Sequence, residues 1–180
     1  MRAFLAIPLP ETTADALSDL QAECPVGRTV PIENLHLTLA FLGDQPEPVL
    51  EAAHEALGTI TLPGFELELA GIGAIGGRAP ALAYIGTSPC PPLKELHQRI
   101  RGRLHGAGLM LPRERFLPHV TLVRFGKNLS ATDLARLGNF LAKYGGSRVA
   151  PFRVDHFCLF RSTIGKGGPI YDELARYDLG

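Results

Sequence analysis

The pattern His-apolar-Thr-Leu occurs twice in this chain, once in each half. The first copy lies in Leu35-His36-Leu37-Thr38-Leu39 and the second in Pro118-His119-Val120-Thr121-Leu122. Both copies alternate polar and apolar residues, which is typical of a β-strand with one buried face. In a strand, the histidine and the threonine two positions later point to the same face. Each strand is therefore expected to bury its apolar side chains and to present an imidazole beside a hydroxyl.

Apolar periodicity, proline and glycine divide the chain into short elements. The mixture of helices and strand pairs favours an α+β fold over a doubly wound parallel sheet. The chain has no linker long enough to separate two domains. Strands are predicted over Arg2–Ile7, Leu35–Leu42, Phe65–Leu69, Ala81–Gly86, His119–Phe125, Phe152–Phe160 and Pro169–Tyr177. Helices are predicted between Pro10 and Pro25, over Pro46–Leu57, from Pro91 or Pro92 to Leu104, and over Ser130–Tyr144, with a glycine-rich turn over Ser162–Gly168. The spacing of three and four residues in the third helix predicts that Leu93, Leu96, Ile100 and Leu104 face inward, and Ser130 is the expected N-cap of the fourth.

Composition excludes several classes of protein. Apolar residues make up 46% of the 180 residues and charged residues 20%, which is the balance of a folded chain. Eighteen basic and eighteen acidic residues cancel, so neither non-specific coating of nucleic acid nor a polybasic membrane contact is expected. A local cluster of basic side chains could still bind a short polyanion. No apolar run has the length of a membrane-spanning helix, and the first residues do not have the pattern of a signal peptide.

The three cysteines, Cys24, Cys90 and Cys158, form neither a CxxC pair nor a disulfide framework. Each is expected to be a small apolar side chain, and a cytoplasmic location is expected.

The doubled motif suits phosphoryl transfer if a pseudo-twofold axis brings both copies to one cleft. One imidazole can take a proton from water while the other gives a proton to the leaving oxygen. Thr38 and Thr121 can donate hydrogen bonds to the phosphoryl oxygens. The residues alone do not assign the two proton-transfer roles. Metal binding by His36 and His119 is the minor alternative, because no HExxH pattern, close acidic partner or cysteine ligand accompanies them.

Other polar and aromatic residues are weaker candidates. Strict alternation places Arg124 on the strand face opposite His119, so Arg124 could reach the cleft only if the strand ended or bulged there. Arg161 and Lys166 are alternative basic contacts, and a solvated surface position is the rival prediction for all three. Phe41, Phe125 and Tyr84 are candidates for stacking on a base, with a core position as the rival for each. His54, His97, His105 and His156 are expected to serve packing or the surface.

The two motif copies lie in longer matching segments, Glu33–Leu39 followed by Phe41–Gly43, and Phe116–Leu122. Met1–Ile7 precedes them, and Phe160–Ser162 with Gly167–Tyr171 follows them. With them, the chain resembles the two-histidine phosphoesterase superfamily, and within it the RNA 2′,3′-cyclic phosphodiesterases, also called LigT-like 2′-5′ RNA ligases. One departure is Ala40, where many relatives carry a basic residue.

The resemblance implies a bilobed, pseudo-twofold α+β fold over residues 1–180, with two antiparallel-rich sheets facing a central cleft and helices outside. It implies metal-independent hydrolysis of a 2′,3′-cyclic phosphate to a 2′-phosphomonoester, with His36 as proton donor and His119 as proton acceptor. Thr38 and Thr121 would bind phosphate, and Arg124 and Arg161 are candidate substrate contacts. The implied partners are RNA ends or small cyclic nucleotides; no cofactor, membrane or obligate protein partner is expected, and the chain is expected to be a monomer. Two alternatives stay open: the reverse ligation reaction, and a nucleotide-binding module without turnover.

Overall fold

The computed structural model describes residues 1–180 as ten strands, four α-helices and one short 3₁₀ helix. The strands are β1 (Arg2–Pro8), β2 (Arg28–Thr29), β3 (His36–Asp44), β4 (Phe65–Leu67), β5 (Leu69–Ile75), β6 (Leu82–Thr87), β7 (Val120–Arg124), β8 (Phe152–Val154), β9 (His156–Gly165) and β10 (Gly168–Asp178). The helices are α1 (Glu11–Ala22), η1 (Ile32–Asn34), α2 (Glu47–Leu57), α3 (Pro91–Gly106) and α4 (Ala131–Tyr144).

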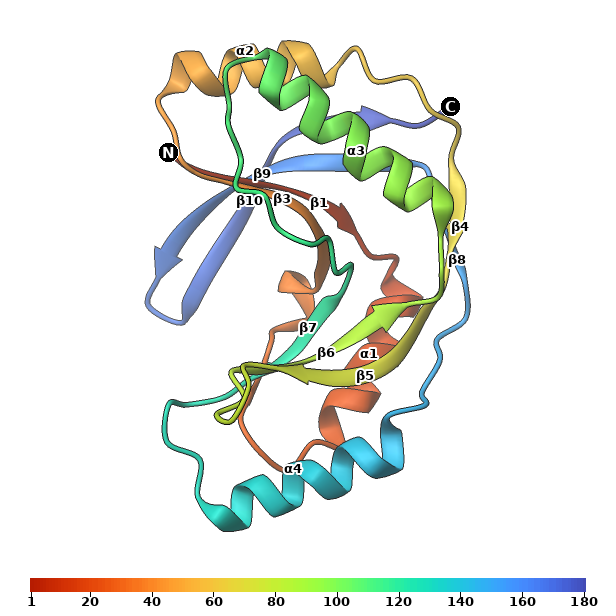
Figure 1. The fold of residues 1–180 in the computed structure, drawn as a ribbon, viewed down its shortest axis with the longest axis vertical. Coiled ribbons are helices and arrows are strands. Elements are labelled where there is room, and N and C mark those ends of the chain that lie inside the picture. Colours follow the sequence, from red (N-terminus) through yellow and green to blue (C-terminus); the bar gives the residue numbers. More distant parts are fainter.

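Two antiparallel groups of strands meet at one residue pair. The main sheet has the order β10-β9-β1-β3-β7-β6-β5, and β2 pairs with the outer part of β7. Between β3 and β7 the only paired residues are Leu37 and Val120. We call β1, β3, β9 and β10 the first lobe, and β2, β5, β6 and β7 the second lobe (Figure 1). The predicted α+β fold with antiparallel sheets is confirmed. The two groups of strands join through this single pair into one sheet, and β4 and β8 form a separate two-stranded sheet.

The helices lie outside the sheets, and two of them, α1 and α3, pack against strands from the other half of the sequence. Helix α3 packs near β3 and α2 in the first lobe, whereas α1 and α4 lie against β7 and β5 of the second lobe (Figure 1). Each lobe therefore takes elements from both halves of the chain. The two lobes therefore do not correspond to the two halves of the sequence.

Amphipathic periodicity accounts for the helices. The predicted inward residues of α3, Leu93, Leu96, Ile100 and Leu104, are all buried. The predicted cap of α4 is also present, since the Ser130 hydroxyl accepts a hydrogen bond from the Asp133 amide at 3.1 Å. None of the helices combines the length and the apolarity that crossing a membrane requires.

The strand predictions differ from the structure at breaks and at missed segments, since neither β2 nor the part of β5 after Leu69 was predicted. Glu68 separates β4 from β5, and Asp155 separates β8 from β9, where one continuous strand was predicted in each case. The segment 162–168 is not a long turn, because β9 continues to Gly165 and pairs with β10 (Gly168–Asp178). Only Lys166 and Gly167 form the turn, and the positive φ of 125° at Gly168 lets the chain reverse this tightly.

All three cysteines are free thiols. Cys158 is buried, as expected of a small apolar side chain, whereas Cys24 and Cys90 are half-buried.

Candidate active site

The two motif strands lie side by side at the junction of the lobes. Leu37 and Val120 face each other across the β3–β7 ladder, and both side chains are completely buried. Because side chains alternate along a strand, their neighbours in the motifs project to the opposite face. These neighbours, His36, Thr38, His119 and Thr121, are all half-buried. The structure therefore brings the four predicted site residues to one face of the sheet.

The ring of His36 is fixed at both nitrogens. Its Nδ1 lies 2.7 Å from the carbonyl oxygen of Asn34, which can only accept, so Nδ1–H donates. Its Nε2 lies 3.0 Å from the hydroxyl of Thr38 and is the nitrogen left for proton transfer. Burial lowers the pKa of His36 below its ordinary value; the Asn34 carbonyl opposes the shift, and the charge of Arg124 and the nearby His119 add to it.

His119 repeats the Nδ1 contact of His36 at the other motif strand. Its Nδ1 lies 2.7 Å from the carbonyl oxygen of Leu117, again two residues before the histidine. The edge of Tyr84 packs against the ring, with centroids 5.5 Å apart. Both imidazoles are thus held through Nδ1, which leaves Nε2 of each as the exchanging nitrogen. The sequence motif did not reveal this shared backbone contact.

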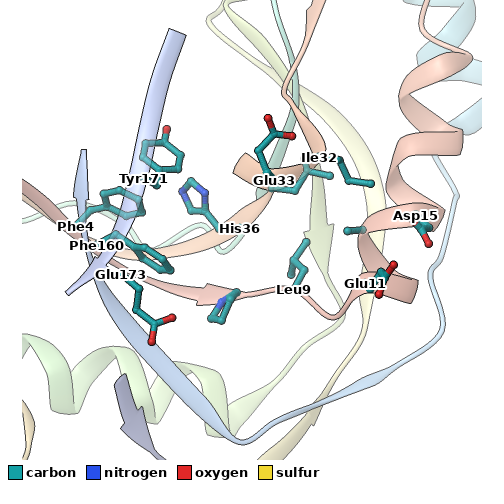
Figure 2. Close-up of a pocket in the computed structure, with 13 residues that line it drawn as sticks. Phe4, Leu9, Glu11, Asp15, Ile32, Glu33, His36, Phe160, Tyr171 and Glu173 are labelled. Atoms are coloured by element: carbon teal, nitrogen blue, oxygen red, sulfur yellow. The ribbon is translucent and has the colours of Figure 1, made fainter. Parts of the chain in front are cut away.

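Aromatic side chains form a wall beside His36. Phe4 and Tyr171 lie 4.9 Å and 5.3 Å from the imidazole, measured between ring centroids, and Phe160 stacks on Phe4 at 5.3 Å. Figure 2 shows this wall around a cavity of about 460 Å³ that extends from His36 toward Leu9 and helix α1. Sequence reasoning missed these three rings, because the residues belong to β1, β9 and β10 and come together only in the folded sheet.

Of the three residues considered for stacking on a base, two are accessible near the site and one packs against the core. Phe41 is 70% exposed and lies 6.2 Å from the ring of Phe4, so the core position weighed for it is wrong. Tyr84 is half-buried next to His119. Phe125 is partly buried and packs against the core, which confirms the core position given as its alternative.

A β-bulge in β7 changes the direction of Arg124. Tyr84 of β6 pairs with Thr121 and Ala83 pairs with Val123, so Leu122 is an extra residue in β7. Leu122 and Val123 are both buried, although strict alternation would expose one of them. The alternation after the bulge is therefore shifted by one, and exposed Arg124 follows the side of Thr121. The bulge that Arg124 needs to reach the cleft is therefore present, so the placement opposite His119 by strict alternation does not apply. The charge of Arg124 is near enough to lower the pKa of His36.

Gln21 fixes the bulge, and sequence reasoning missed it. The side chain is only 4% exposed, and its Nε2 donates to the carbonyl oxygens of Leu122 at 2.8 Å and Val30 at 2.9 Å. A buried amide must find such partners, because an unpaired polar group in the core is costly. The signal in the sequence was a glutamine four residues after Leu17, on the apolar face of α1.

Arg161 is not brought to the histidine pair. Its Nε and Nη2 donate to Oδ2 of Asp172, at 3.1 Å and 2.9 Å, within the β9–β10 hairpin. Its neighbour Phe160 faces the cavity, so Arg161 points to the opposite face of β9. Lys166 lies at the turn of the same hairpin.

No three His, Cys, Asp or Glu side chains are grouped so that they could hold a metal ion. Two of the four remaining histidines have aromatic partners. His97 stacks on Phe116 with ring centroids 3.7 Å apart, and Nδ1 of His54 lies 2.9 Å from the hydroxyl of Tyr177.

Proteins with established names are similar to this chain over most of its length. A protein from Aeropyrum pernix named RNA 2′,3′-cyclic phosphodiesterase is 32% identical over 82% of this chain and 83% of its own length. One of the same name from Escherichia coli K12 is 30% identical over 99% of this chain and 96% of its own length.

Solved structures agree with these relatives. The E. coli LigT structure in apo form covers 99% of this chain and 96% of its own chain, at 29% identity and a TM-score of 0.80. LigT complexed with 3′-AMP covers the same shares at 28% identity and a TM-score of 0.78. The model of the family described as the 2′-5′ RNA ligase superfamily matches residues 8–165, and the chain therefore belongs to that superfamily.

Proposed function

We propose that this protein hydrolyses RNA-terminal or nucleoside 2′,3′-cyclic phosphates to 2′-phosphomonoesters. The observation that carries the proposal is the pairing of the two motif strands at Leu37 and Val120, which sets His36 and His119 on one face. The names of the relatives support the substrate class, since several are RNA 2′,3′-cyclic phosphodiesterases. The LigT complex with 3′-AMP supports a nucleotide ligand.

In the proposed mechanism the two histidines act at Nε2. His119 accepts a proton from water as its oxygen attacks phosphorus, and the bond from phosphorus to the ribose 3′ oxygen breaks. His36 gives its Nε2 proton to that leaving oxygen, so the 2′ oxygen keeps the phosphate. The Nδ1 contacts with Asn34 and Leu117 hold both rings in this orientation. The assignment of donor and acceptor follows the family resemblance.

Hydroxyl and guanidinium groups stabilise the charge on phosphorus in this proposal. Thr38 and Thr121 donate to the non-bridging oxygens, so substrate replaces the hydrogen bond between Thr38 and His36 Nε2. Arg124 adds a positive charge beside them, and the same charge makes protonated His36 a stronger acid. The whole of residues 1–180 acts as one bilobed domain, because the site takes side chains from both lobes.

The family description also names ligation, which is the reverse reaction. The same residues would serve both directions by microscopic reversibility, and the abundance of water favours hydrolysis. A binding module without turnover is disfavoured because all four motif residues are intact.

The first experiment incubates the protein with a nucleoside 2′,3′-cyclic phosphate, and separately with a short RNA ending in one. Both reactions contain excess EDTA, and the product is identified by chromatography. We expect a 2′-phosphate product, formed at the same rate as without EDTA. A 3′-phosphate would contradict the assigned leaving group, and a loss of activity in EDTA that one metal ion restores would contradict metal independence.

The variants His36→Ala and His119→Ala test the two roles. Each is expected to lower kcat by at least about 10²-fold, the lower range for a missing general acid or base. The matched control is His105→Ala on the exposed last turn of α3, which is expected to keep full activity. An active double variant His36→Ala/His119→Ala would overturn the mechanism.

A further inference from the structure

The two sides of the site carry opposite charge. The cavity between His36 and the start of helix α1 is lined by four carboxylates and no Lys or Arg side chain (Figure 2). These carboxylates are Glu11, Asp15, Glu33 and Glu173. A chain of phosphodiesters would be repelled from this side.

The second lobe has the reverse composition next to the site. Its segments 25–32, 73–87 and 118–130 contain no Asp or Glu. They carry four exposed basic residues, Arg28, Arg78, Arg124 and Lys127, which we call the basic edge. None of the four forms an ion pair, whereas Arg99, Arg148, Arg161 and Arg176 elsewhere each do.

Backbone contacts bring the basic edge together. Arg28 of β2 is the register partner of Arg124 of β7, and Leu82 of β6 is its partner on the other side. The amide of Phe125 donates to the carbonyl of Ala81 at 2.8 Å, which ties the end of β7 to the β5–β6 turn that carries Arg78. Figure 1 shows this turn beside the end of β7, where the chain leaves toward α4. Lys127 follows Phe125 by two residues.

The pairing of Arg28 with Arg124 is unfavourable by itself, because like charges directly opposite in a ladder repel. A glycine next to Arg28 nevertheless allows the two strands to approach closely at this pair. Gly27 has φ +87°, and a Cβ there would lie 2.6 Å from the Phe125 ring and 2.7 Å from the Arg124 carbonyl oxygen. Only glycine permits this approach of β2 to β7. Two arginines held together without a carboxylate are suited to a ligand with several negative charges.

We propose that the basic edge binds the backbone phosphates of a single-stranded RNA whose 2′,3′-cyclic end lies between His36 and His119. This proposal rests on the proposed function and adds the path of the strand. The RNA leaves the site over the second lobe, away from the acidic cavity. The zero net charge of the chain conceals this polarity, because the acidic and basic groups lie on different sides of the site.

The experiment compares two substrates: a nucleoside 2′,3′-cyclic phosphate and a short single-stranded RNA ending in a 2′,3′-cyclic phosphate. The variants are Arg28→Gln, Arg78→Gln and Lys127→Gln, all at exposed positions outside the motif. For RNA, each is expected to raise KM several-fold. Each should also reduce the slope of log KM against log salt by about 0.7 for every phosphate that the variant no longer neutralises. For the mononucleotide, kcat and KM are expected to stay unchanged. The matched control is Arg103→Gln, an exposed arginine on α3 without an ion pair.

The outcomes separate this proposal from the proposed function. Failure of the unaltered protein to hydrolyse either substrate would overturn the proposed function. Hydrolysis of both, with the three variants equal to Arg103→Gln on RNA, would overturn the strand path and leave the proposed function standing. A KM that rises equally for both substrates would also overturn it, because the residues would then serve the reacting phosphate and not the strand.

Discussion

At the scale of single residues, the environment of His36 has a consequence for stability. Burial, and to a smaller extent the charge of Arg124 and the nearby His119, lower its pKa in the folded protein below the ordinary value of 6.5. As the pH falls through 6.5, the unfolded chain takes up a proton that the folded protein does not, so the free energy of unfolding decreases. The decrease ends once the pH has passed below the pKa of the folded state. The pKa of His97 is also lowered by burial, so it contributes in the same direction.

We expect the variant His36→Gln to lose less stability than the unaltered protein between pH 7.5 and pH 5.5. Denaturant unfolding at the two pH values measures this, since the linkage acts on the free energy of unfolding. His97→Gln provides an independent comparison at a site outside the motif strands. Equal decreases for the unaltered protein and His36→Gln would contradict the lowered pKa.

Arg124 allows a second prediction at the residue scale. The variant Arg124→Gln removes a positive charge that disfavours protonated His36, so the pKa of His36 is expected to rise. Hydrolysis is expected to slow by about 10²-fold, the usual effect of removing one oxyanion donor. An NMR titration of His36 and steady-state kinetics measure the two effects, with Arg103→Gln as control. An unchanged pKa of His36 would show that the guanidinium lies away from the site.

At the scale of elements, the β7 bulge depends on helix α1. The Gln21 side chain donates to the carbonyl of Leu122, the extra residue of the bulge, and to the carbonyl of Val30, which follows β2. It therefore connects α1, the end of β2 and the bulge. The variant Gln21→Leu removes the side-chain donor from the carbonyls of Leu122 and Val30, and only the Leu122 carbonyl keeps another donor, the Val30 amide at 2.9 Å. We expect a destabilisation of about 1–3 kcal/mol. We also expect a lower kcat, together with a rise in the pKa of His36 as Arg124 loses its position.

Thermal melting, kinetics and NMR titration of Gln21→Leu test this connection. The matched control is Gln98→Leu, at an exposed position of α3, which is expected to change none of the three. A purely structural role for Gln21 would lower stability without moving the pKa of His36, and that result would contradict a positioning role.

Elements also show how far the sequence could predict the structure. Alternation predicted the face shared by His36 and Thr38, and spacing predicted the buried residues of α3, because both depend on local geometry. The direction of Arg124 and the exposure of Phe41 could not be predicted in this way. Both follow register shifts, in β7 and β3, that are visible only against the neighbouring strand. The aromatic wall is likewise a product of strand order, since Phe4, Phe160 and Tyr171 come from three strands.

At the scale of the whole molecule, the site lies at the narrowest connection between the lobes. One residue pair, Leu37 with Val120, joins the two groups of strands and sets the positions of both histidines. Each lobe also contains helices from the other half of the sequence, with α1 near β7 and α3 near β3. Neither half can therefore complete a lobe, and 37 buried residues from both lobes form one apolar cluster.

Because each lobe contains helices from the other half of the sequence, we expect the two lobes to unfold together. In scanning calorimetry we expect one transition whose calorimetric and van't Hoff enthalpies agree. The variant Leu37→Ala removes a completely buried side chain from the junction, at a cost of about 2–5 kcal/mol. Because the lobes share their helices, we expect the single transition to move to a lower temperature by roughly 2–4 °C per kcal/mol, without splitting. A second transition, in the unaltered protein or in Leu37→Ala, would mean that the lobes are separate domains that meet only at the site.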